Sequence, residues 1–220
     1  MATKMAPVLA ISIENQSRFD EMYAPLLTVI KSKTEFQQTE DATSALRLLS
    51  QRPPPSTVLI TDQALTLPEN AAVWTAVLNY VAGGGTVVIM GFFSSFVLPD
   101  NIKPFFTRAG LPWARGTYQR TTLTINKAAA AAAGVNIQKL PQNYSQKALF
   151  VSNVAAEDML YRTDDNSVLE SRVFAPESAH VPGETAVALA KVGAGRLGYV
   201  GDVNAEHGSH AVVLAICGLL

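Results

Sequence analysis

The sequence contains few of the residues from which catalytic and metal sites are usually built. Its single cysteine, Cys217, excludes an internal disulfide and a cysteine-rich zinc site, and is typical of a reducing compartment such as the cytoplasm. Only three histidines are present, and 17 basic residues nearly balance 18 acidic ones without any basic run. This balance argues against nucleic acid and anionic membranes as partners.

Long apolar segments are also missing. The apolar run at residues 211–220 is about half the length of a membrane-spanning helix. The run at residues 8–13 is followed at once by polar residues, which does not fit a signal peptide. Because 48% of the 220 residues are apolar and no low-complexity linker divides them, we expect residues 1–220 to form one soluble domain.

What the sequence does contain is an alternation of strand and helix, clearest in residues 57–95. A β-branched strand at residues 57–61 precedes a helix with an apolar stripe that includes Val73, Trp74 and Val77. Three glycines at residues 83–85 stop this helix, and residues 86–90 form a strand that is apolar on both faces. This pattern predicts an α/β fold with parallel strands.

Similar elements are predicted on both sides of this segment. Toward the amino end we expect a strand at 8–13, a helix over 19–30 interrupted by Pro25, a strand at 35–39 and a helix capped by Asp41 or Thr43. Toward the carboxyl end, the predicted elements are a helix near 102–110, strands at 121–126, 148–152 and 171–174, a polyalanine helix ending at Gly134, two strands at 185–191 and 197–200, and a closing helix from Ala211. The predicted architecture is a three-layer, mostly parallel, flavodoxin-like sheet with helices on both faces and a strand-rich C-terminal part.

Two short phrases are similar to a known family. Residues 78–91 read LNYVAGGGTVVIMG, and residues 193–202 read GAGRLGYVGD. They resemble the class I glutamine amidotransferase-like superfamily, within it the ThuA-like branch and the trimerisation domain of bacterial β-galactosidases. In element order the resemblance covers about residues 8–218. For the amidotransferases of this superfamily, it implies a cysteine in a strand-to-helix turn and a histidine and glutamate after a late strand.

The chain departs from the family at both of these places. After Met90 it reads Gly-Phe-Phe-Ser-Ser without a cysteine, and its late strand ends in Gly201-Asp202 where His-x-Glu is expected. Cys217 lies in an apolar segment and is predicted to be a small buried hydrophobe. We therefore do not expect amidotransferase activity and favour a pseudoenzyme that needs no cofactor.

The predicted binding site lies at the carboxyl ends of the parallel strands, where open α/β sheets place their ligands. Polar, glycine and aromatic residues follow four predicted strands there: Glu14, Asn15, Asp62, Gln63, Gly91, Phe92, Phe93, Ser94, Asp202 and Asn204. Such a lining suits a small polar metabolite or a carbohydrate. We predict a non-catalytic binding or assembly module, with a homo-oligomer as one expectation.

A serine hydrolase is the alternative function. It would use a serine nucleophile, an imidazole base and an orienting carboxylate, drawn from Ser94 or Ser95, His207 or His210, and Asp202 or Glu206. The Gly-x-Ser-x-Gly elbow is absent. The hypothesis therefore requires a serine oxygen within hydrogen-bonding reach of an imidazole nitrogen.

Three further features have simpler interpretations than a ligand site. Asp202, Glu206, His207 and His210 are spaced like metal ligands, but we favour a turn at Asp202, exposed Glu206 and His207, and His210 at the start of a helix, with no metal. His180 is predicted to lie on the surface. Residues 193–196, Gly-Ala-Gly-Arg, join two strands and predict a hairpin instead of a phosphate-binding turn. The aromatic residues between 92 and 118 are predicted to pack inside, with an exposed patch for self-association as the alternative.

Overall fold

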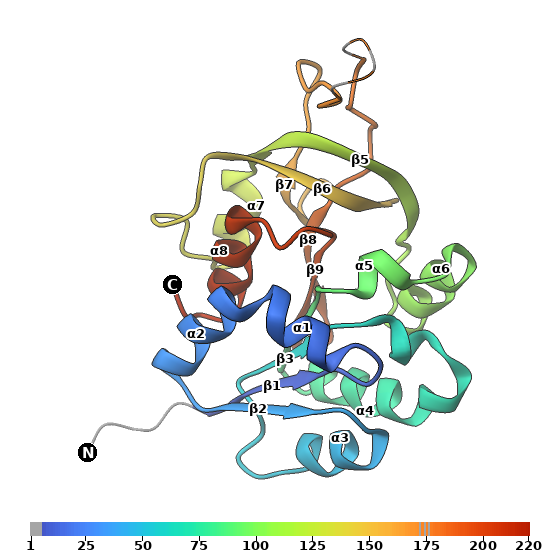
Figure 1. Ribbon diagram of the computed structural model, residues 1–220, viewed down its shortest axis with the longest axis vertical. Helices are drawn as coiled ribbons and strands as arrows, with labels where there is room; N and C mark the ends of the chain where they lie inside the picture. Colours follow the sequence, from blue (N-terminus) through green and yellow to red (C-terminus); the bar gives the residue numbers. More distant parts are fainter. Residues whose placement is uncertain (1–5, 172, 174, 176) are drawn as a thin grey trace.

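Nine strands form one mixed sheet in the computed structural model, which describes residues 6–171, 173, 175 and 177–220. The strand order is β2-β1-β3-β4-β9-β8-β7-β5-β6, and Figure 1 shows β2 near one end of the molecule and β5 and β6 near the other. The sheet has two halves that meet at β9, one parallel and one antiparallel.

The parallel half contains five strands, four of them only four residues long. They are β2 (Phe36–Thr39), β1 (Val8–Ile11), β3 (Thr57–Ile60), β4 (Thr86–Ile89) and β9 (Gly195–Val200). All residues of β1, β3 and β4 are buried, because helices cover both faces of this half. The predicted strands at the amino end are therefore confirmed, and their carboxyl ends meet at one edge.

The antiparallel half corrects the prediction of a mostly parallel sheet. It adds β8 (Val187–Val192), β7 (Met159–Arg162), β5 (Ala114–Ile125) and β6 (Asn143–Ser152). Among the described residues, four neighbouring pairs are parallel and four are antiparallel. The β8–β9 connection is too short for a parallel crossover, so β8 must run backwards. The predicted strand at 171–174 includes Arg172 and Phe174, which lie outside the described residues.

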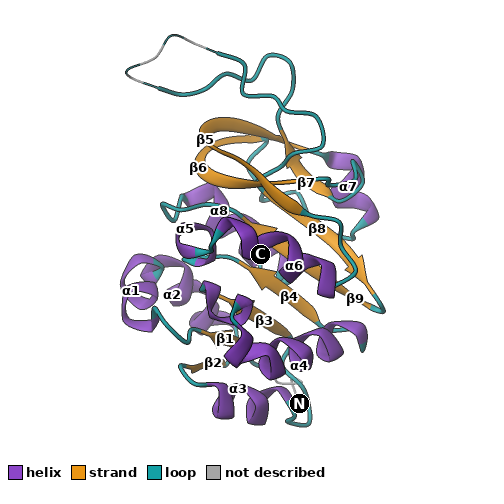
Figure 2. Cartoon of the chain, turned by 90° about the vertical axis from the view of Figure 1, so that its right-hand side faces the viewer, coloured by secondary structure: helices purple, strands orange, loops and turns teal. Residues whose placement is uncertain are grey.

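Helices cover the two faces of the sheet, as Figure 2 shows. One apolar cluster packs between the sheet and α1 (Gln16–Met22), α2 (Ala24–Lys33), α7 (Lys127–Ala132) and α8 (His207–Ile216). The other packs under α3 (Ala42–Leu49), α4 (Ala71–Ala82), the short α5 (Phe93–Phe96) and α6 (Pro99–Arg108), with two 3-10 turns at Gln63–Thr66 and Pro68–Asn70. The predicted three layers are present.

Local chemistry explains where these helices begin and end. The expected helix over 19–30 is two helices, because α1 ends at Met22 and Pro25 lies in the first turn of α2, where a proline is tolerated. Asp41 caps α3 by accepting a hydrogen bond from the backbone N–H of Ser44 at 2.8 Å. The last helix begins at His207, earlier than the predicted Ala211. None of the described helices is long and apolar enough to cross a membrane.

The aromatic residues after β4 mostly pack inside, as predicted. Phe93, Phe105, Phe106 and Trp113 are buried in the second cluster, and Trp74 of α4 stacks on Phe105 with ring centroids 4.0 Å apart. Phe96, Leu98 and Tyr118 remain exposed. The segment of residues 92–118 therefore packs most of its aromatic side chains into the core and leaves the side chains of Phe96, Leu98 and Tyr118 at the surface.

Candidate functional site

The loops after β1 and β3 are joined by one buried carboxylate, that of Asp62. Its Oδ2 accepts hydrogen bonds from the backbone N–H groups of Glu14 at 2.8 Å and Asn15 at 3.3 Å, and its Oδ1 accepts one from Ala64 at 3.0 Å. The Gln63 side chain donates to the Glu14 carboxylate. Burial raises the pKa of Asp62, and these hydrogen bonds oppose that effect. The structure thus brings four predicted site residues together, with the Asp62 carboxylate occupied by backbone donors.

The turn after β4 is tight. Gly91 has a φ of +68°, and a Cβ there would lie 2.7 Å from the carbonyl oxygen of Thr61, so glycine is required. The next residues lead into α5, where the buried Ser94 hydroxyl lies 3.0 Å from the Tyr199 hydroxyl. Because Tyr199 donates its proton to the carbonyl oxygen of Leu149 at 2.8 Å, Ser94 must donate to Tyr199. The Ser94 proton is therefore used within the core.

The loop after β9 is held by a buried carboxylate that accepts backbone hydrogen bonds, as the loops at Asp62 are. Asp202 is buried, and its two carboxylate oxygens accept hydrogen bonds from the backbone N–H groups of Asn204 at 2.8 Å and Glu206 at 2.6 Å. Burial raises the pKa of Asp202, with the charge of Glu206 acting in the same direction. Asp202 thus shapes the turn that precedes α8, as predicted.

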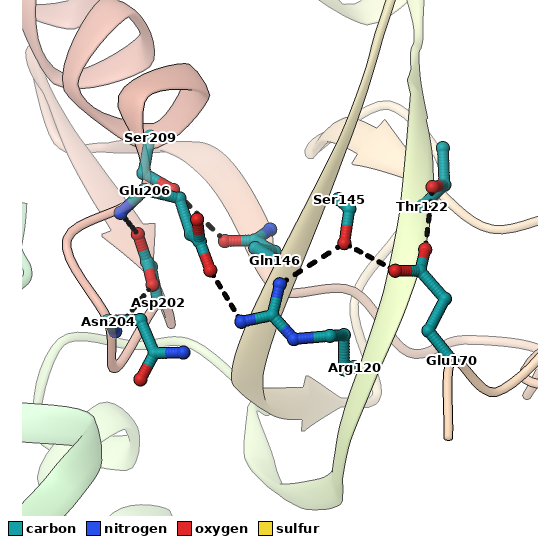
Figure 3. A network of polar contacts seen from close by, with 9 residues as sticks. All are labelled: Arg120, Thr122, Ser145, Gln146, Glu170, Asp202, Asn204, Glu206 and Ser209. Atoms are coloured by element: carbon teal, nitrogen blue, oxygen red, sulfur yellow. Dashed lines mark hydrogen bonds and ion pairs between the residues drawn. The ribbon is translucent and has the colours of Figure 1, made fainter. Parts of the chain in front are cut away.

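A polar network on β5 and β6 meets this turn (Figure 3). Arg120 of β5 forms an ion pair with Glu206 at 2.6 Å and donates to the Ser145 hydroxyl at 3.3 Å. Ser145 in turn donates to Glu170 at 2.6 Å. Glu206 is therefore partly buried and paired, which corrects the prediction that it is solvent-exposed. Arg120 is not among the predicted site residues, because its only local signal is the row of polar residues along β5.

The corner between Gly91 and Asp202 is closed by side chains. Gly91 and Asp202 line a crevice too narrow to hold a water molecule, together with residues that include Tyr23 and His210. The Tyr23 ring stacks on the Phe19 ring with centroids 4.9 Å apart, and it packs against the His210 ring with centroids 5.6 Å apart. His210 is buried, and its Nε2 has no hydrogen-bond partner among the residues that the structure describes. The predicted cleft at this point of the carboxyl edge is therefore filled.

The hydrolase alternative gains no support from this arrangement. Ser94 is buried against Tyr199, whereas His207 is exposed on α8. No hydrogen bond in the described part of the chain joins Ser94 or Ser95 to an imidazole; His180 bonds to the Thr163 hydroxyl at 3.0 Å. Burial raises the pKa of the Cys217 thiol to about 12, which confirms Cys217 as a buried hydrophobe. Residues 6–171, 173, 175 and 177–220 contain no group of three His, Cys, Asp or Glu side chains placed to hold a metal ion.

Comparison with known proteins finds similarity in structure and not in sequence. No family model and no curated protein matches the sequence. A putative ThuA-like protein from Parabacteroides merdae ATCC 43184 aligns with a TM-score of 0.56 at 13% identity, covering 98% of this chain and 89% of that one. A putative GMP synthase component from Thermoplasma acidophilum aligns with a TM-score of 0.51 at 10% identity, covering 99% and 94%. The chain has the class I glutamine amidotransferase-like fold.

A third structural neighbour is much longer than this chain. The β-galactosidase from Bacillus circulans sp. alkalophilus aligns with a TM-score of 0.58 at 14% identity, covering 97% of this chain and 31% of that chain. The chain therefore corresponds to about a third of that enzyme. At these identities the likeness concerns the fold alone, and this fold is the one that the sequence resemblance implies. The amidotransferase-like scaffold here carries Gly91 and Asp202 at the two corners where the resemblance implies catalytic residues.

Proposed function

We propose that the chain is a non-catalytic carbohydrate-binding module that holds its ligand on an aromatic pair, the half-buried Phe92 and the exposed Phe96, at the carboxyl edge of the sheet. The two rings lie 5.7 Å apart, and Phe96 is 43% exposed. This partly exposed pair is the observation that carries the proposal, because the crevice lined by Gly91 and Asp202 is closed. The fold shared with part of a β-galactosidase directs the choice of ligand toward saccharides.

We propose a non-catalytic role because the polar groups at the carboxyl edge are already engaged in structural hydrogen bonds. Ser94 donates to Tyr199, and Asp62 and Asp202 accept backbone hydrogen bonds. A nucleophile must instead contact a base that takes its proton. Groups held in this way position the turns of the carboxyl edge and leave no activated atom for a reaction.

A saccharide fits the remaining surface for chemical reasons. One face of a pyranose ring presents C–H groups that pack on an aromatic ring, and its hydroxyls need polar partners nearby. Phe92 packs edge-on against Tyr23 at 6.4 Å, which fixes the orientation of its ring. At the same edge, Arg120, Asn204 and Glu206 follow β9 or contact the turn after it. The edge therefore offers a fixed apolar surface with a polar surround.

Titration calorimetry with galacto- and gluco-oligosaccharides tests the proposal. We expect at least one of them to bind, and Phe96→Ala to weaken that binding at least tenfold. Leu46→Ala is the matched control, because Leu46 is a comparably exposed apolar residue on α3. Lack of binding by any sugar in the panel, or equal binding by the Phe96 variant, would overturn the proposal.

Two further measurements separate the competing functions. Sedimentation equilibrium of the wild type and Phe96→Ala shows whether the patch of Phe96 and Leu98 joins copies of the chain; oligomerisation without sugar binding would replace the binding role with an assembly role. Hydrolysis of chromogenic esters is expected to be absent. Turnover that Ser94→Ala abolishes would establish the hydrolase instead.

A further inference from the structure

A ligand-sized cavity with charged walls lies at the opposite edge of the sheet. A cavity of about 490 Å³ opens beside the amino ends of β4 and β9, under the end of α7. This volume is within the range of small-molecule sites. Because β8 runs antiparallel to β9, its carboxyl end also lies at this edge. We propose that this cavity binds a small zwitterion, a free amino acid, through two walls of opposite charge.

The basic wall is formed by Lys191 and Arg196. They stand directly opposite each other in the β8–β9 ladder, so their side chains lie on the same face of the sheet. Like charges in this relation repel unless an anion lies between them. Within the described part of the chain neither forms an ion pair with a carboxylate. Arg196 donates one hydrogen bond, to the carbonyl oxygen of Ala133 at 2.7 Å, which leaves other guanidinium donors for a ligand carboxylate.

The acidic wall is formed by Glu157 and Asp158, which precede β7. The carbonyl oxygen of Asp158 accepts a hydrogen bond from Leu189 of β8 at 2.8 Å, so this segment is tied to the strand that carries Lys191. Burial, and then the neighbouring charge of Glu157, raise the pKa of Asp158. Among the described residues, no ion pair joins Glu157 or Asp158 to a cationic side chain. An ammonium group placed there would relieve the repulsion.

The two walls do not neutralise each other. No ion pair within 4.0 Å joins them among the described residues, so the charged groups are separated, and Leu189, Ala132 and Ala133 provide apolar surface in the same cavity. A simple anion would meet the acidic wall, and a simple amine would meet the basic one. A molecule with both an ammonium and a carboxylate satisfies both walls at once.

The basic wall is also held in place by the backbone. The backbone N–H of Ala194 donates to the carbonyl oxygen of Ala82 at 3.0 Å, and that of Arg196 donates to Gly85 at 3.0 Å. A Cβ on Gly195 would lie 2.2 Å from two backbone oxygens, so the hairpin touches the α4–β4 turn directly. A site fixed in this way needs little reordering to bind a ligand.

Calorimetric titration with the twenty free amino acids tests the proposal. For the best ligand, the corresponding amine without the carboxylate and the corresponding acid without the amine are titrated in parallel. We expect both analogues to bind at least tenfold more weakly than the amino acid. If no amino acid binds, or if one analogue binds equally well, the two-wall site is wrong.

Substitutions in each wall test the contribution of that wall to amino-acid binding separately. Lys191→Met is expected to weaken amino-acid binding at least tenfold, and Glu157→Gln with Asp158→Asn to do the same. Lys147→Met is the matched control, because Lys147 lies at the other edge of the sheet over the Tyr118 ring. Unchanged circular dichroism and melting temperature show that each variant folds. Binding that survives the Lys191 change would overturn the proposal, whatever the outcome of the saccharide titrations.

Discussion

The two edges of the sheet use their polar groups in opposite ways. At the carboxyl edge, Asp62 and Asp202 are buried and hydrogen-bonded to backbone, and the crevice between β4 and β9 has no room for water. At the amino edge, Lys191 and Arg196 line a cavity of about 490 Å³, and neither forms an ion pair with a carboxylate of the described residues. In this fold the carboxyl edge is the expected ligand site. Here structural hydrogen bonds occupy the carboxylates Asp62 and Asp202, so this edge offers an aromatic surface and not a cavity between β4 and β9, whereas the amino edge holds an open cavity.

The antiparallel half of the sheet accounts for part of this difference. In a purely parallel sheet, all loops that follow strands gather at one edge. The reversal at β8 brings its carboxyl end, with Lys191, to the other edge, where it meets the amino ends of β4 and β9. The antiparallel β8–β9 hairpin therefore builds one wall of the cavity.

The largest expected effect comes from opening the closed edge. Tyr23→Ala removes a 3% exposed ring that stacks on Phe19 and covers the crevice beside Asp202. We expect the free energy of unfolding to fall by about 4 kcal/mol, as for other buried aromatic-to-alanine changes. Urea denaturation followed by circular dichroism measures the loss.

Tyr118→Ala is the control for this experiment. Tyr118 is a half-exposed tyrosine on β5, and its removal is expected to cost less than about 1 kcal/mol. If the Tyr23 variant is no less stable than the Tyr118 variant, packing does not close the carboxyl edge, and the contrast between the edges fails.

The second effect concerns the wall of the open edge. Gly195→Ala places a Cβ 2.2 Å from the carbonyl oxygens of Gly85 and Val81, and backbone atoms cannot move aside easily. We expect a loss of about 3 kcal/mol in the free energy of unfolding and a loss of amino-acid binding as the hairpin shifts. Urea denaturation and calorimetry check the two effects.

Gly83→Ala, in the α4–β4 turn that the hairpin contacts, distinguishes local crowding from a general need for glycine. A Cβ there would meet its nearest backbone oxygen at 3.4 Å, an ordinary contact. The stability of this variant should stay within about 0.5 kcal/mol of the wild type. Equal losses at both positions would mean that the hairpin contact is not what fixes the amino edge.

The parts of this molecule that the sequence predicts are those set by local pattern. The strands β1, β3 and β4 follow from short apolar runs, and the Asp41 cap from its place before an amphipathic segment. The meeting of Glu14 and Asp62 follows from parallel strands ending at one edge. Each of these inferences needs only a few neighbouring residues.

Features that depend on distant pairing were missed. The strand β7 has four residues and is recognisable only through its partners β5 and β8. The ion pair of Arg120 with Glu206 joins residues 86 positions apart. The amino-edge cavity also needs the end of α7 and the segment before β7 to lie beside the β8–β9 hairpin, and the predicted hairpin does not specify these neighbours. Tyr23 fills the predicted cleft because α1 and α2 break at that residue, a consequence of packing rather than of spacing.

The smallest effect concerns pH and separates burial from hydrogen bonding at the carboxyl edge. Burial raises the pKa of Asp202, so protonation favours the folded state. The stability from this source is fully present below the unfolded pKa of about 3.8 and is lost as pH rises through the folded pKa. Asp202→Asn cannot titrate. The wild type's advantage in unfolding free energy over this variant should therefore shrink as pH rises from 3 to 7.

Asp41 provides the opposite case, because it is exposed and its hydrogen bond from the Ser44 backbone lowers its pKa. The contribution of Asp41 to stability is present above its unfolded pKa and is lost as pH falls. The wild type's advantage in unfolding free energy over Asp41→Asn should therefore grow as pH rises from 3 to 7.

At neutral pH, Asp202→Asn still loses one buried backbone hydrogen bond, which costs about 1 kcal/mol. Urea titrations at several pH values measure both differences. The stability differences between the wild type and each of the two variants should change with pH in opposite directions. If they change in the same direction, burial does not control the pKa of Asp202, and the Asp202 carboxylate is exposed to solvent instead of closed in at the carboxyl edge.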